Sequence, residues 1–389
     1  MNKGCKIVTI KEIIALFKGE EQANAIELVS FEEIGNQVVA QKGLYRSGDR
    51  VLFIEPDYCL SDNPIFQEYL TPGGDPKKCK LGRTNRIRAI KFNLHTGNSL
   101  PVYSYGILLH SDDVQKHANL LLNEETDFDE ALGITKYEEP EPFAQGGKKG
   151  ATCPFPQSMY QTDEVNINNL INDVKFPTYI IGSEKVDGSS ITIWYKDGKS
   201  GIASRKLGRP LKYKKITGYR KANIFLKLLK VFGYKYDGKI IKTVESDDQF
   251  VIAGKPYLEK LEDYCKRGSV NIVLRGELVG KGCKGSGNPN NPKAKEESHI
   301  EFFGIDDYSK HAAKLQNSEV KRIAEELGLQ LVKEYFQKEF NCKEELLQEC
   351  QKIFDDEQKN GRIIEGIVLR NPTSTFSCKL MNMLYDSKK

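Results

Sequence analysis

The chain has 389 residues, which is long for one compact unit and predicts two domains. A hydrophobic fraction of 39%, with 18 Phe and 18 Tyr, supplies enough apolar side chain for packed cores and excludes a globally disordered chain. The 58 basic and 54 acidic residues leave a net charge of only +4, so a surface for a polyanion has to be local.

The nine cysteines contain no C-x-x-C pair, and this scattered pattern predicts reduced thiols in a cytoplasmic or nuclear protein. No run of 18 apolar residues occurs, so we expect no membrane span. Lys11 and Glu12 interrupt the apolar N-terminus, which makes it a poor signal peptide and leaves an organelle address open. We expect a monomer.

Residues 1–135 are predicted to be rich in strands. Turn signals separate the apolar runs Ala25–Val29, Gln37–Ala40 and Val51–Glu55, and Arg86–Ile90 alternates basic with apolar residues. Short strands at this spacing predict a small barrel, for which an oligonucleotide-binding (OB) barrel is one candidate. A β-sandwich fits the pattern nearly as well.

Residues 136–158 concentrate proline and glycine, and we interpret them as the linker between two domains. From residue 159 to 389 the pattern is mixed, and it predicts an α+β domain with antiparallel sheets. A short helix is expected over Asp163–Val174, with Thr162 as its N-cap. The expected strands are Tyr179–Ile181, Ser190–Tyr195, Asn271–Leu274, Ile300–Ile305 and Ile364–Leu369. The expected helices are Ser318–Leu327 and Cys342–Phe354.

Two stretches concentrate positive charge. Residues 205–242 hold thirteen basic residues against Asp237 alone, and residues 77–91 hold seven basic residues. Aromatic side chains interleave with the lysines over Lys212–Tyr236, a mixture that suits phosphates and bases. An ordinary solvated face, with part of Ala222–Val231 buried in a core, is the alternative.

A lysine that precedes a turn stands out in the segment Glu184-Lys185-Val186-Asp187-Gly188. A lone K-x-D-G is weak, because a hairpin with a surface lysine has the same pattern. An ordered set of further segments strengthens it. The set comprises Ser204-Arg205, Leu274–Gly280 (LRGELVG), Glu301–Asp306 (EFFGID), Glu365–Arg370 (EGIVLR) and Lys379 within Ser377–Met381.

This ordered series resembles the covalent nucleotidyltransferase superfamily of DNA ligases, RNA ligases and mRNA-capping guanylyltransferases. Gln161–Glu164 and the glycine-rich stretch after Glu277 are closer to RNA ligases. The segments Gly48–Glu55 and Arg86–Phe92 are similar to the N-terminal OB-like barrel of such ligases. Only ten residues follow Lys379, which leaves no room for the C-terminal OB domain of DNA ligases and capping enzymes.

The resemblance implies an ATP-dependent RNA ligase that joins a 3′-hydroxyl to a 5′-phosphate. Lys185 would become covalently adenylylated, and the AMP would then pass to the 5′ end of the RNA. A free lysine is neutral in only about one molecule in a thousand at pH 7.4, so nearby cations are expected to favour the neutral amine. The implied cations are Lys379, Arg205 and a divalent metal.

The resemblance also implies roles for acidic residues. Glu277 and Glu365 would hold Mg²⁺ or Mn²⁺ through hard oxygen ligands, with Glu277 as an alternative ribose partner. Asp187 would support the lysine loop or bind metal-bound water, and Glu184 would belong to the ATP site. Arg205 would contact the ribose or the RNA 5′-phosphate.

Lys379 would bind the α-phosphate, but relatives have two lysines spaced K-x-K and this chain has one. Relatives also place Phe directly before the Asp306 position, whereas this chain has Ile305. Because residues two apart share a strand face, either Phe303 by stacking or Ile305 by apolar contact is expected to cover the adenine.

The segment Gly280–Pro292 is predicted to be irregular, either a mobile loop near Glu277 or a disordered insert. Three alternative functions stay open: a DNA nick ligase, a GTP-using capping enzyme and a non-catalytic nucleic-acid-binding protein.

Overall fold

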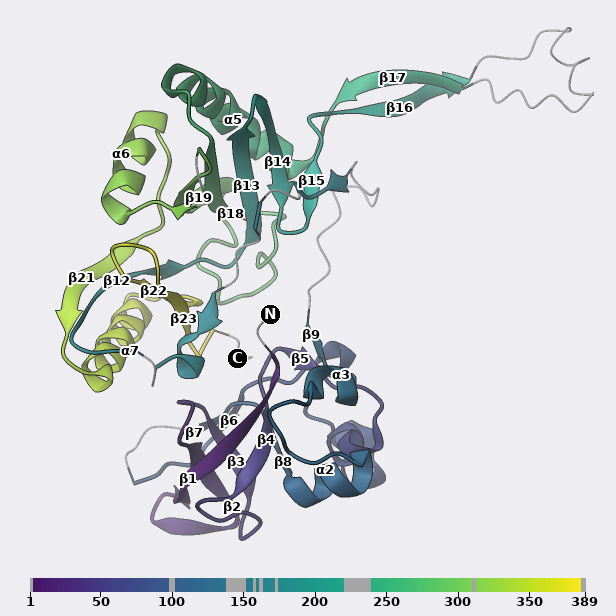
Figure 1. The fold of residues 1–389 in the computed structure, drawn as a ribbon, viewed down its shortest axis with the longest axis vertical. Helices are drawn as coiled ribbons and strands as arrows, with labels where there is room; N and C mark the ends of the chain where they lie inside the picture. Colours follow the sequence, from purple (N-terminus) through teal and green to yellow (C-terminus); the bar gives the residue numbers. More distant parts are fainter. Residues whose placement is uncertain are drawn as a thin grey trace, which may run out of the picture.

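A computed structural model describes residues 3–97, 102–137, 152–156, 159–160, 164–171, 174–219, 239–309 and 313–385. Its elements form two units, one from residues 5–136 and one from residues 153–381 (Figure 1). A backbone hydrogen bond of 2.7 Å, from Gly35 N–H to the Asn168 carbonyl, joins them. No helix among the described residues is both long and apolar enough to cross a membrane.

The N-terminal unit is built on a curved antiparallel sheet in the order β3-β2-β1-β4-β8. β1 pairs with β4 through its first residues and with β2 through the rest, so the sheet bends along this strand. The strands are β1 (Cys5–Lys18), β2 (Glu21–Phe31), β3 (Gln37–Gln41), β4 (Arg50–Ile54) and β8 (Ile107–His110).

Two hydrogen bonds bring the edge strand β3 back to the chain ahead of β8. The Tyr105 N–H donates to the Gln37 carbonyl at 2.8 Å, and the Val39 N–H donates to Ser104 Oγ at 3.0 Å. The sheet is thereby a partly closed barrel around buried residues of β1, β2, β4 and β8. Its assignment to the OB class, and the domain boundaries, remain predictions.

Short elements complete the N-terminal unit, and its helices pack around a second core. These short elements are α1 (Gln67–Leu70), α2 (Ser111–Ala118), α3 (Phe128–Leu132), β5 (Tyr58–Cys59), β6 (Ile90–Phe92), β7 (Val102–Ser104) and β9 (Thr135–Lys136). The strand predicted over Arg86–Ile90 is wrong, because only Ile90 enters β6. The alternation has another origin: Ile87 is buried, whereas Arg86 pairs with Asp57 and lies over the Tyr137 ring.

The C-terminal unit contains two larger sheets. The seven-stranded sheet has the order β10-β15-β14-β13-β18-β19-β20 and the five-stranded sheet the order β11-β23-β22-β12-β21. Only the β11–β23 pairing is parallel, so the predicted α+β class with antiparallel sheets is confirmed. The strands are β10 (Cys153–Pro154), β15 (Leu207–Arg209), β14 (Lys199–Ser204), β13 (Ser189–Lys196), β18 (Ile272–Val279), β19 (His299–Asp307) and β20 (Ala313–Lys314), then β11 (Val165–Asn166), β23 (Ser377–Met381), β22 (Gly366–Arg370), β12 (Thr178–Lys185) and β21 (Glu334–Phe340).

Three helices bury the outer faces of these sheets. α5 (Gln249–Gly268) and α6 (Asn317–Leu327) share a core with the seven-stranded sheet, and α7 (Lys343–Lys359) packs on the five-stranded sheet. The two helices predicted from periodicity correspond to α6 and α7. The sequence analysis missed α5, because Pro256 inside it is an ordinary helix breaker. Burial of residues such as Leu258 and Leu261 outweighs that penalty.

The helix expected over Asp163–Val174 is wrong where the structure describes it. Val165–Asn166 form β11, and a short 3₁₀ helix follows at Ile167–Asn169 with Asn166, not Thr162, as its cap. Residues 161–163 and 172–173 lie outside the described part. Residues 138–151 of the predicted linker also lie outside the described part of the chain. Toward the two ends of the linker, Lys136 belongs to β9 and Cys153–Pro154 form β10.

One hairpin projects from the C-terminal unit (Figure 1). Its strands, β16 (Lys212–Tyr219) and β17 (Lys239–Glu245), form a separate two-stranded sheet. Residues 220–238, which include most of the basic and aromatic stretch, lie outside the described part of the chain.

Candidate active site

Lys185 lies at the end of β12, where this strand runs antiparallel to β22. Glu365 directly precedes β22, and the register pairs Lys185 with Gly366. The Lys185 ammonium nitrogen is 2.6 Å from a carboxylate oxygen of Glu365, and both side chains are largely buried. The strand pairing therefore brings together two residues that are 180 positions apart.

The loop after Lys185 crosses from the five-stranded sheet to the seven-stranded sheet. It leads into β13, whose Ser190 pairs with Glu277 of β18. A Cβ atom on Gly188 would lie 2.5 Å from the Leu278 carbonyl oxygen and 2.9 Å from Cγ of Glu277. The glycine of K-x-D-G is thus required by this close approach, because any side chain would separate the lysine loop from Glu277.

Carboxylates dominate the electrostatics around the lysine. Burial, together with repulsion from Glu365 and Asp187, raises the pKa of Glu277 to about 8. Burial and the charge of Glu365 raise the pKa of Asp187 to about 6. Burial alone would lower the pKa of Lys185, but Glu365, Glu277 and Asp187 raise it above its ordinary value.

The expectation of crowded positive charge at Lys185 is therefore wrong for the ligand-free protein. Three acidic residues from separate stretches surround the ammonium, and the sequence analysis considered only the cations. Lys284, in the irregular segment after Glu277, is a cation that partly offsets the charge of Asp187 and Glu277, and the sequence analysis did not name it.

The irregular segment Gly280–Pro292 is not a disordered insert, because it packs on the lysine loop. The Asn291 side-chain amide donates to the Asp187 carbonyl at 3.1 Å and to the Gly285 carbonyl at 3.1 Å. The buried Asn290 amide donates to the Tyr385 carbonyl at 2.9 Å.

Tyr385 in turn donates its hydroxyl to the Asp187 carboxylate at 2.8 Å. The sequence analysis missed Asn290, Asn291 and Tyr385, since no motif contains them. The only signal was their position, just after two of the motif segments.

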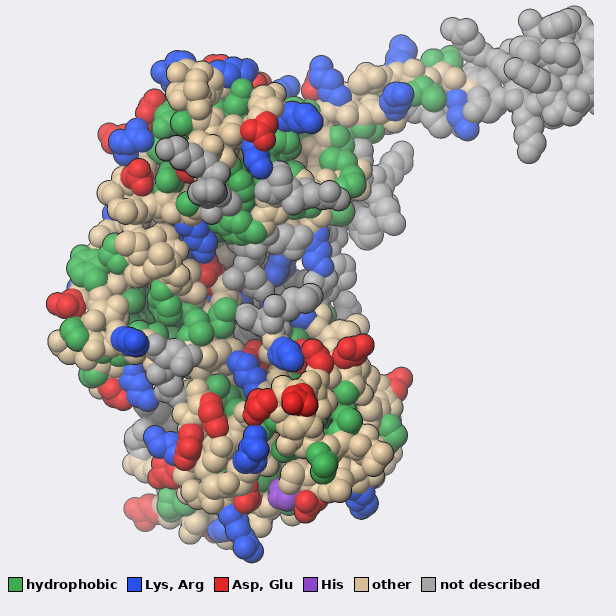
Figure 2. Space-filling view, in the orientation of Figure 1, with side chains coloured by type: hydrophobic (Ala, Val, Ile, Leu, Met, Phe, Trp, Pro, Cys, Tyr) green, Lys and Arg blue, Asp and Glu red, His purple; other side chains and the backbone are tan. Residues whose placement is uncertain are grey.

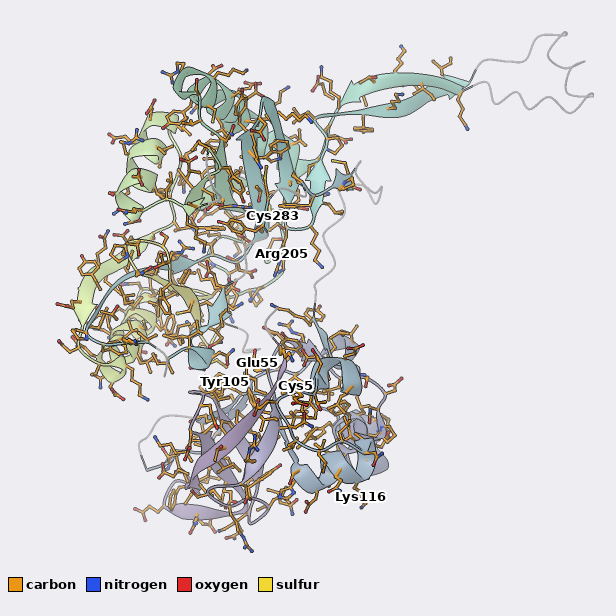
Figure 3. The ribbon with its side chains drawn as sticks, in the orientation of Figure 1. Cys5, Glu55, Tyr105, Lys116, Arg205 and Cys283 are labelled. Carbon is orange, nitrogen blue, oxygen red and sulfur yellow. The ribbon has the colours of Figure 1, made fainter. Side chains whose placement is uncertain are left out.

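Lys379 and Arg205 lie farther out. Lys379 is in β23, paired with Val368, and lines a cavity with Glu55, Tyr105 and Lys136 of the N-terminal unit. In Figure 3, Glu55 and Tyr105 lie on the side of the N-terminal unit that faces the C-terminal unit. Arg205 directly follows β14 and is exposed, as expected for a residue that meets a large substrate.

Glu184, the residue before Lys185, is buried, and other protein groups hold its carboxylate. Arg362 donates to its two oxygens at 3.3 and 3.2 Å, and the Tyr335 hydroxyl lies 3.4 Å from one of them. Burial raises the pKa of Glu184 above its usual range. Its assignment to the ATP site remains a prediction.

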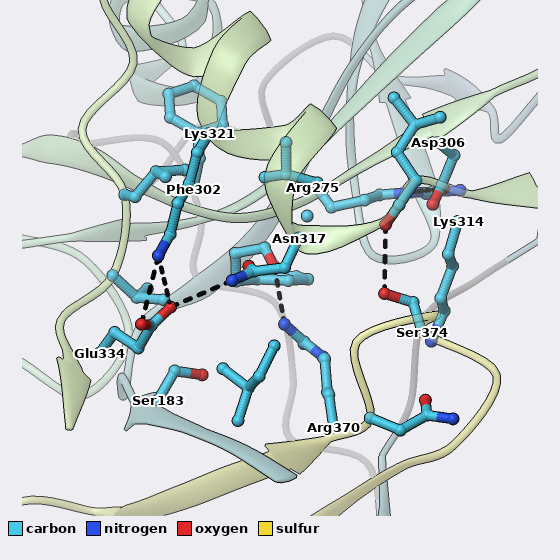
Figure 4. Close-up of a pocket in the computed structure, with 18 of the residues that line it drawn as sticks. Ser183, Arg275, Phe302, Asp306, Lys314, Asn317, Lys321, Glu334, Arg370 and Ser374 are labelled. Carbon is cyan, nitrogen blue, oxygen red and sulfur yellow. Dashed lines mark hydrogen bonds and ion pairs between the residues drawn. The ribbon is translucent and has the colours of Figure 1, made fainter. Parts of the chain in front are cut away.

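A cavity between the two sheets is lined by Phe303, by Ser183 of β12 and by Arg370 of β22. Figure 4 shows Ser183 and Arg370 on one side of it and Arg275 and Asp306 on the other. The Arg370 guanidinium donates to the Phe303 carbonyl at 2.7 Å and lies 5.7 Å from the centre of its ring. Ser183 is two residues from Lys185, so this lining residue lies close to Lys185 along β12.

A β-bulge decides which apolar side chain of β19 faces this cavity. The register passes from Gly304, opposite Arg275, to Phe302, opposite Gly276, and leaves Phe303 as the extra residue. The bulge shifts the alternation, so Phe302 and Ile305 both enter the helix-covered core. The inference that Phe303 and Ile305 share a face is therefore wrong, because Phe303 lines the cavity and Ile305 lies in the core.

The donor atoms near Lys185 suit a hard divalent cation, because Glu277, Glu365 and Asp187 all offer carboxylate oxygens. Burial, together with repulsion from neighbouring carboxylates, raises the pKa values of Glu277 and Asp187. As the side chains stand, however, the described residues contain no group of three or more His, Cys, Asp or Glu positioned to hold a metal. The Lys185 ammonium is the cation that they surround in this structure.

The fold matches solved RNA ligases over nearly its whole length. The Naegleria gruberi RNA ligase with pyrophosphate is 22% identical, with a TM-score of 0.69 over 99% of this chain and 98% of that chain. Mutants of that ligase, with ATP and Mn and with AMP and Mn, are each 21% identical, with TM-scores of 0.69 and 0.68 over the same shares.

No curated protein sequence matches the chain. A family model described as RNA ligase matches residues 178–383, which include Lys185, Glu277, Glu365 and Lys379 and make up more than half of the chain. The chain belongs to the RNA ligase family.

Proposed function

We propose that this protein is an ATP-dependent RNA ligase that joins 3′-hydroxyl and 5′-phosphate ends through a lysyl-AMP at Lys185. The observation that carries the proposal is the convergence of Lys185 with Glu365, Glu277 and Asp187 in one largely buried pocket. The similar Naegleria gruberi structures with ATP, AMP and Mn support the choice of nucleotide and metal.

In the first step the Lys185 nitrogen attacks the α-phosphorus of ATP. The N–P bond forms as the bond to the bridging oxygen breaks, and pyrophosphate leaves. The Lys185 ammonium, which lies 2.6 Å from a Glu365 oxygen, must first lose a proton, and that proton passes to solvent. The cavity lined by Phe303 would receive the adenine, with Ser183 between it and the reacting lysine.

Glu277 and Glu365 would hold Mg²⁺ or Mn²⁺, and Asp187 would support the lysine loop or bind metal-bound water. A bound divalent cation supplies positive charge that lowers the pKa of a nearby ammonium and offsets charge on the α-phosphate. Neutralisation of the carboxylates removes the effect that keeps Lys185 protonated in the ligand-free protein.

In the two later steps the AMP moves to the RNA 5′-phosphate, and the 3′-hydroxyl then displaces it. Lys379 would bind the α-phosphate, and Arg205 would hold the ribose or the RNA 5′-phosphate with its planar guanidinium. The exposure of Arg205 supports this division of roles, because it is accessible to a polynucleotide whereas Lys185 is largely buried.

Labelling with α-³²P nucleotides tests the proposal. Wild-type protein with Mg²⁺ or Mn²⁺ should acquire an acid-labile label from ATP, and Lys185→Ala should acquire none. Label from GTP but not ATP would indicate a capping enzyme. Absence of label from either nucleotide with both metals would contradict the proposed chemistry.

A panel of nicked and broken substrates, with RNA or DNA on each side of the break, tests the substrate. We expect sealing when the 3′-hydroxyl strand is RNA and weaker sealing of an all-DNA nick. Arg205→Ala should retain adenylylation and lose sealing. Equal sealing of all-DNA and RNA substrates would contradict RNA as the preferred strand.

A further inference from the structure

The β16–β17 hairpin has a surface that the proposed reaction does not use. Its two strands pair only with each other among the described residues, and most side chains described on β17 are exposed. Even the apolar Ile241 is 56% exposed. An isolated two-stranded hairpin is only marginally stable in water, so a partner that covers this arm would stabilise its fold.

The charge of the arm is almost entirely positive. Its described strands carry five lysines and one acidic residue, Glu245, which lies at the base. Glu245 is paired with Lys212 at 3.0 Å and with Lys255 at 3.5 Å. Lys214 and Lys242, farther along the hairpin, are exposed. Figure 2 shows Lys and Arg side chains spaced along the arm.

The base of the arm is held firmly. Arg209, just before β16, forms a buried ion pair at 3.3 Å with Asp248, just after β17. The Arg209 guanidinium also lies 4.7 Å from the Phe250 ring centre and donates to Ser204 Oγ at 3.1 Å. Asp248 caps α5 by accepting from the Phe250 N–H at 2.8 Å. The arm is thereby anchored to the sheet that carries Glu277.

The arm also lies close in sequence to Arg205, the residue predicted to contact the RNA 5′-phosphate. Arg205 is followed by β15 at Leu207–Arg209 and then by β16 at Lys212. A polynucleotide whose 5′-phosphate lies at Arg205 would thus meet, within a few residues, a hairpin that carries lysines on both faces, with Lys214 opposite Thr243 and Lys242 opposite Lys215. Lysines act as point charges for phosphates, and their attraction does not depend on sequence.

We propose that the β16–β17 hairpin binds the sugar–phosphate backbone of the RNA substrate, away from the ends that are joined. The proposal rests on the proposed function, because it takes the RNA to be the ligase substrate. The eight residues of β16 extend about 26 Å. A B-form DNA strand has one phosphate per about 3.4 Å and an A-form RNA duplex rises less per base pair, so the arm spans at least about seven base pairs.

The test compares a double variant, Lys214→Ala with Lys242→Ala, with a matched control. The control is Lys116→Ala with Lys359→Ala, which removes two exposed lysines of α2 and α7. Each protein is assayed for adenylylation with labelled ATP and for sealing. A long substrate extends about twelve base pairs on each side of the break, beyond the arm, and a short one about four.

We expect the arm variant to adenylylate at the wild-type rate. Its KM for the long substrate should rise about tenfold at moderate salt, with kcat unchanged, and its KM for the short substrate should stay constant. The slope of log binding constant for the long RNA against log salt should become less negative by about 1.8, which is about 0.9 for each lost phosphate contact. The control variant should match the wild type.

Unchanged affinity of the arm variant for long RNA would overturn the proposal, as would an equal loss on long and short substrates. The RNA-binding titration needs no catalysis. If the wild type forms no lysyl-AMP, the proposed chemistry fails while the titration still decides whether the arm binds RNA.

Discussion

Lysines occupy two opposite environments in this protein, the buried pocket of Lys185 and the exposed β16–β17 arm. Lys185 is largely buried among Glu365, Glu277 and Asp187, which control its proton. Lys214 and Lys242 of the arm are exposed on strands whose one carboxylate, Glu245, lies at the base. The pocket suits a lysine that must lose its charge to react, and the arm suits lysines that keep it.

The difference teaches that burial and neighbours, not residue type, assign a role to a lysine. In the pocket, desolvation and the carboxylates act in opposite directions on the pKa, so ATP and metal can shift the balance. On the arm, the side chains of Lys214 and Lys242 are exposed to solvent, where a lysine can attract phosphates. The following predictions test this contrast.

The largest effect is expected for Lys185→Arg. The guanidinium stays protonated and cannot act as the nucleophile, so lysyl-AMP formation should fall by at least about 1,000-fold. Lys214→Arg, which keeps a charged arm residue, should label like the wild type. Substantial labelling of Lys185→Arg would mean that another residue carries the AMP, and peptide mapping of the labelled protein would identify it.

The next effect is expected for Glu277→Gln, which keeps the side-chain size and removes the charge. We expect adenylylation to slow about 100-fold, because a metal ligand and one neighbour of Lys185 are both lost. Glu297→Gln is the control, since Glu297 is exposed and pairs only at the surface with Lys281. Single-turnover labelling measures the rate. A change of less than about threefold in Glu277→Gln would remove this residue from the site.

Gly188→Ala tests the close approach that forms the pocket. The new Cβ would meet the Leu278 carbonyl oxygen at 2.5 Å, so the free energy of unfolding should drop by about 1–3 kcal/mol. Gly287→Ala is the matched control, because a Cβ there meets nothing within 4 Å. Denaturant unfolding measures both. Equal stability of the two variants would show that the lysine loop has room to move.

The smallest effect is expected for Tyr385→Phe. It removes one hydrogen bond of 2.8 Å to Asp187, worth about 0.5–1.5 kcal/mol, and adenylylation should slow about three- to tenfold. Tyr179→Phe is the control, because its hydroxyl donates only to the Gln337 carbonyl at the surface. Wild-type labelling rates in Tyr385→Phe would mean that Asn291 and the loop hold Asp187 without this contact.

The sequence by itself supplied the ordered motif series that contains the candidate residues Lys185, Glu277 and Glu365. The roles of these residues were implied by the resemblance of that series to nucleotidyltransferases, and they remain predictions. Strands near these motifs and the helices near α6 and α7 followed from local patterns. These features are encoded within short segments, so a reader of the sequence can find them.

The tertiary structure decided what depends on contacts between distant segments. The bulge in β19 directed Phe303 to the cavity and Ile305 to the core, although their spacing predicted one face. Packing allowed α5 to run through Pro256. Three carboxylates raise the pKa of Lys185, whereas the resemblance had implied cations, Lys379, Arg205 and a metal, that would favour the neutral amine. The direction of a side chain and the charge around it depend on residues that are close in space, and only the folded chain determines which residues these are.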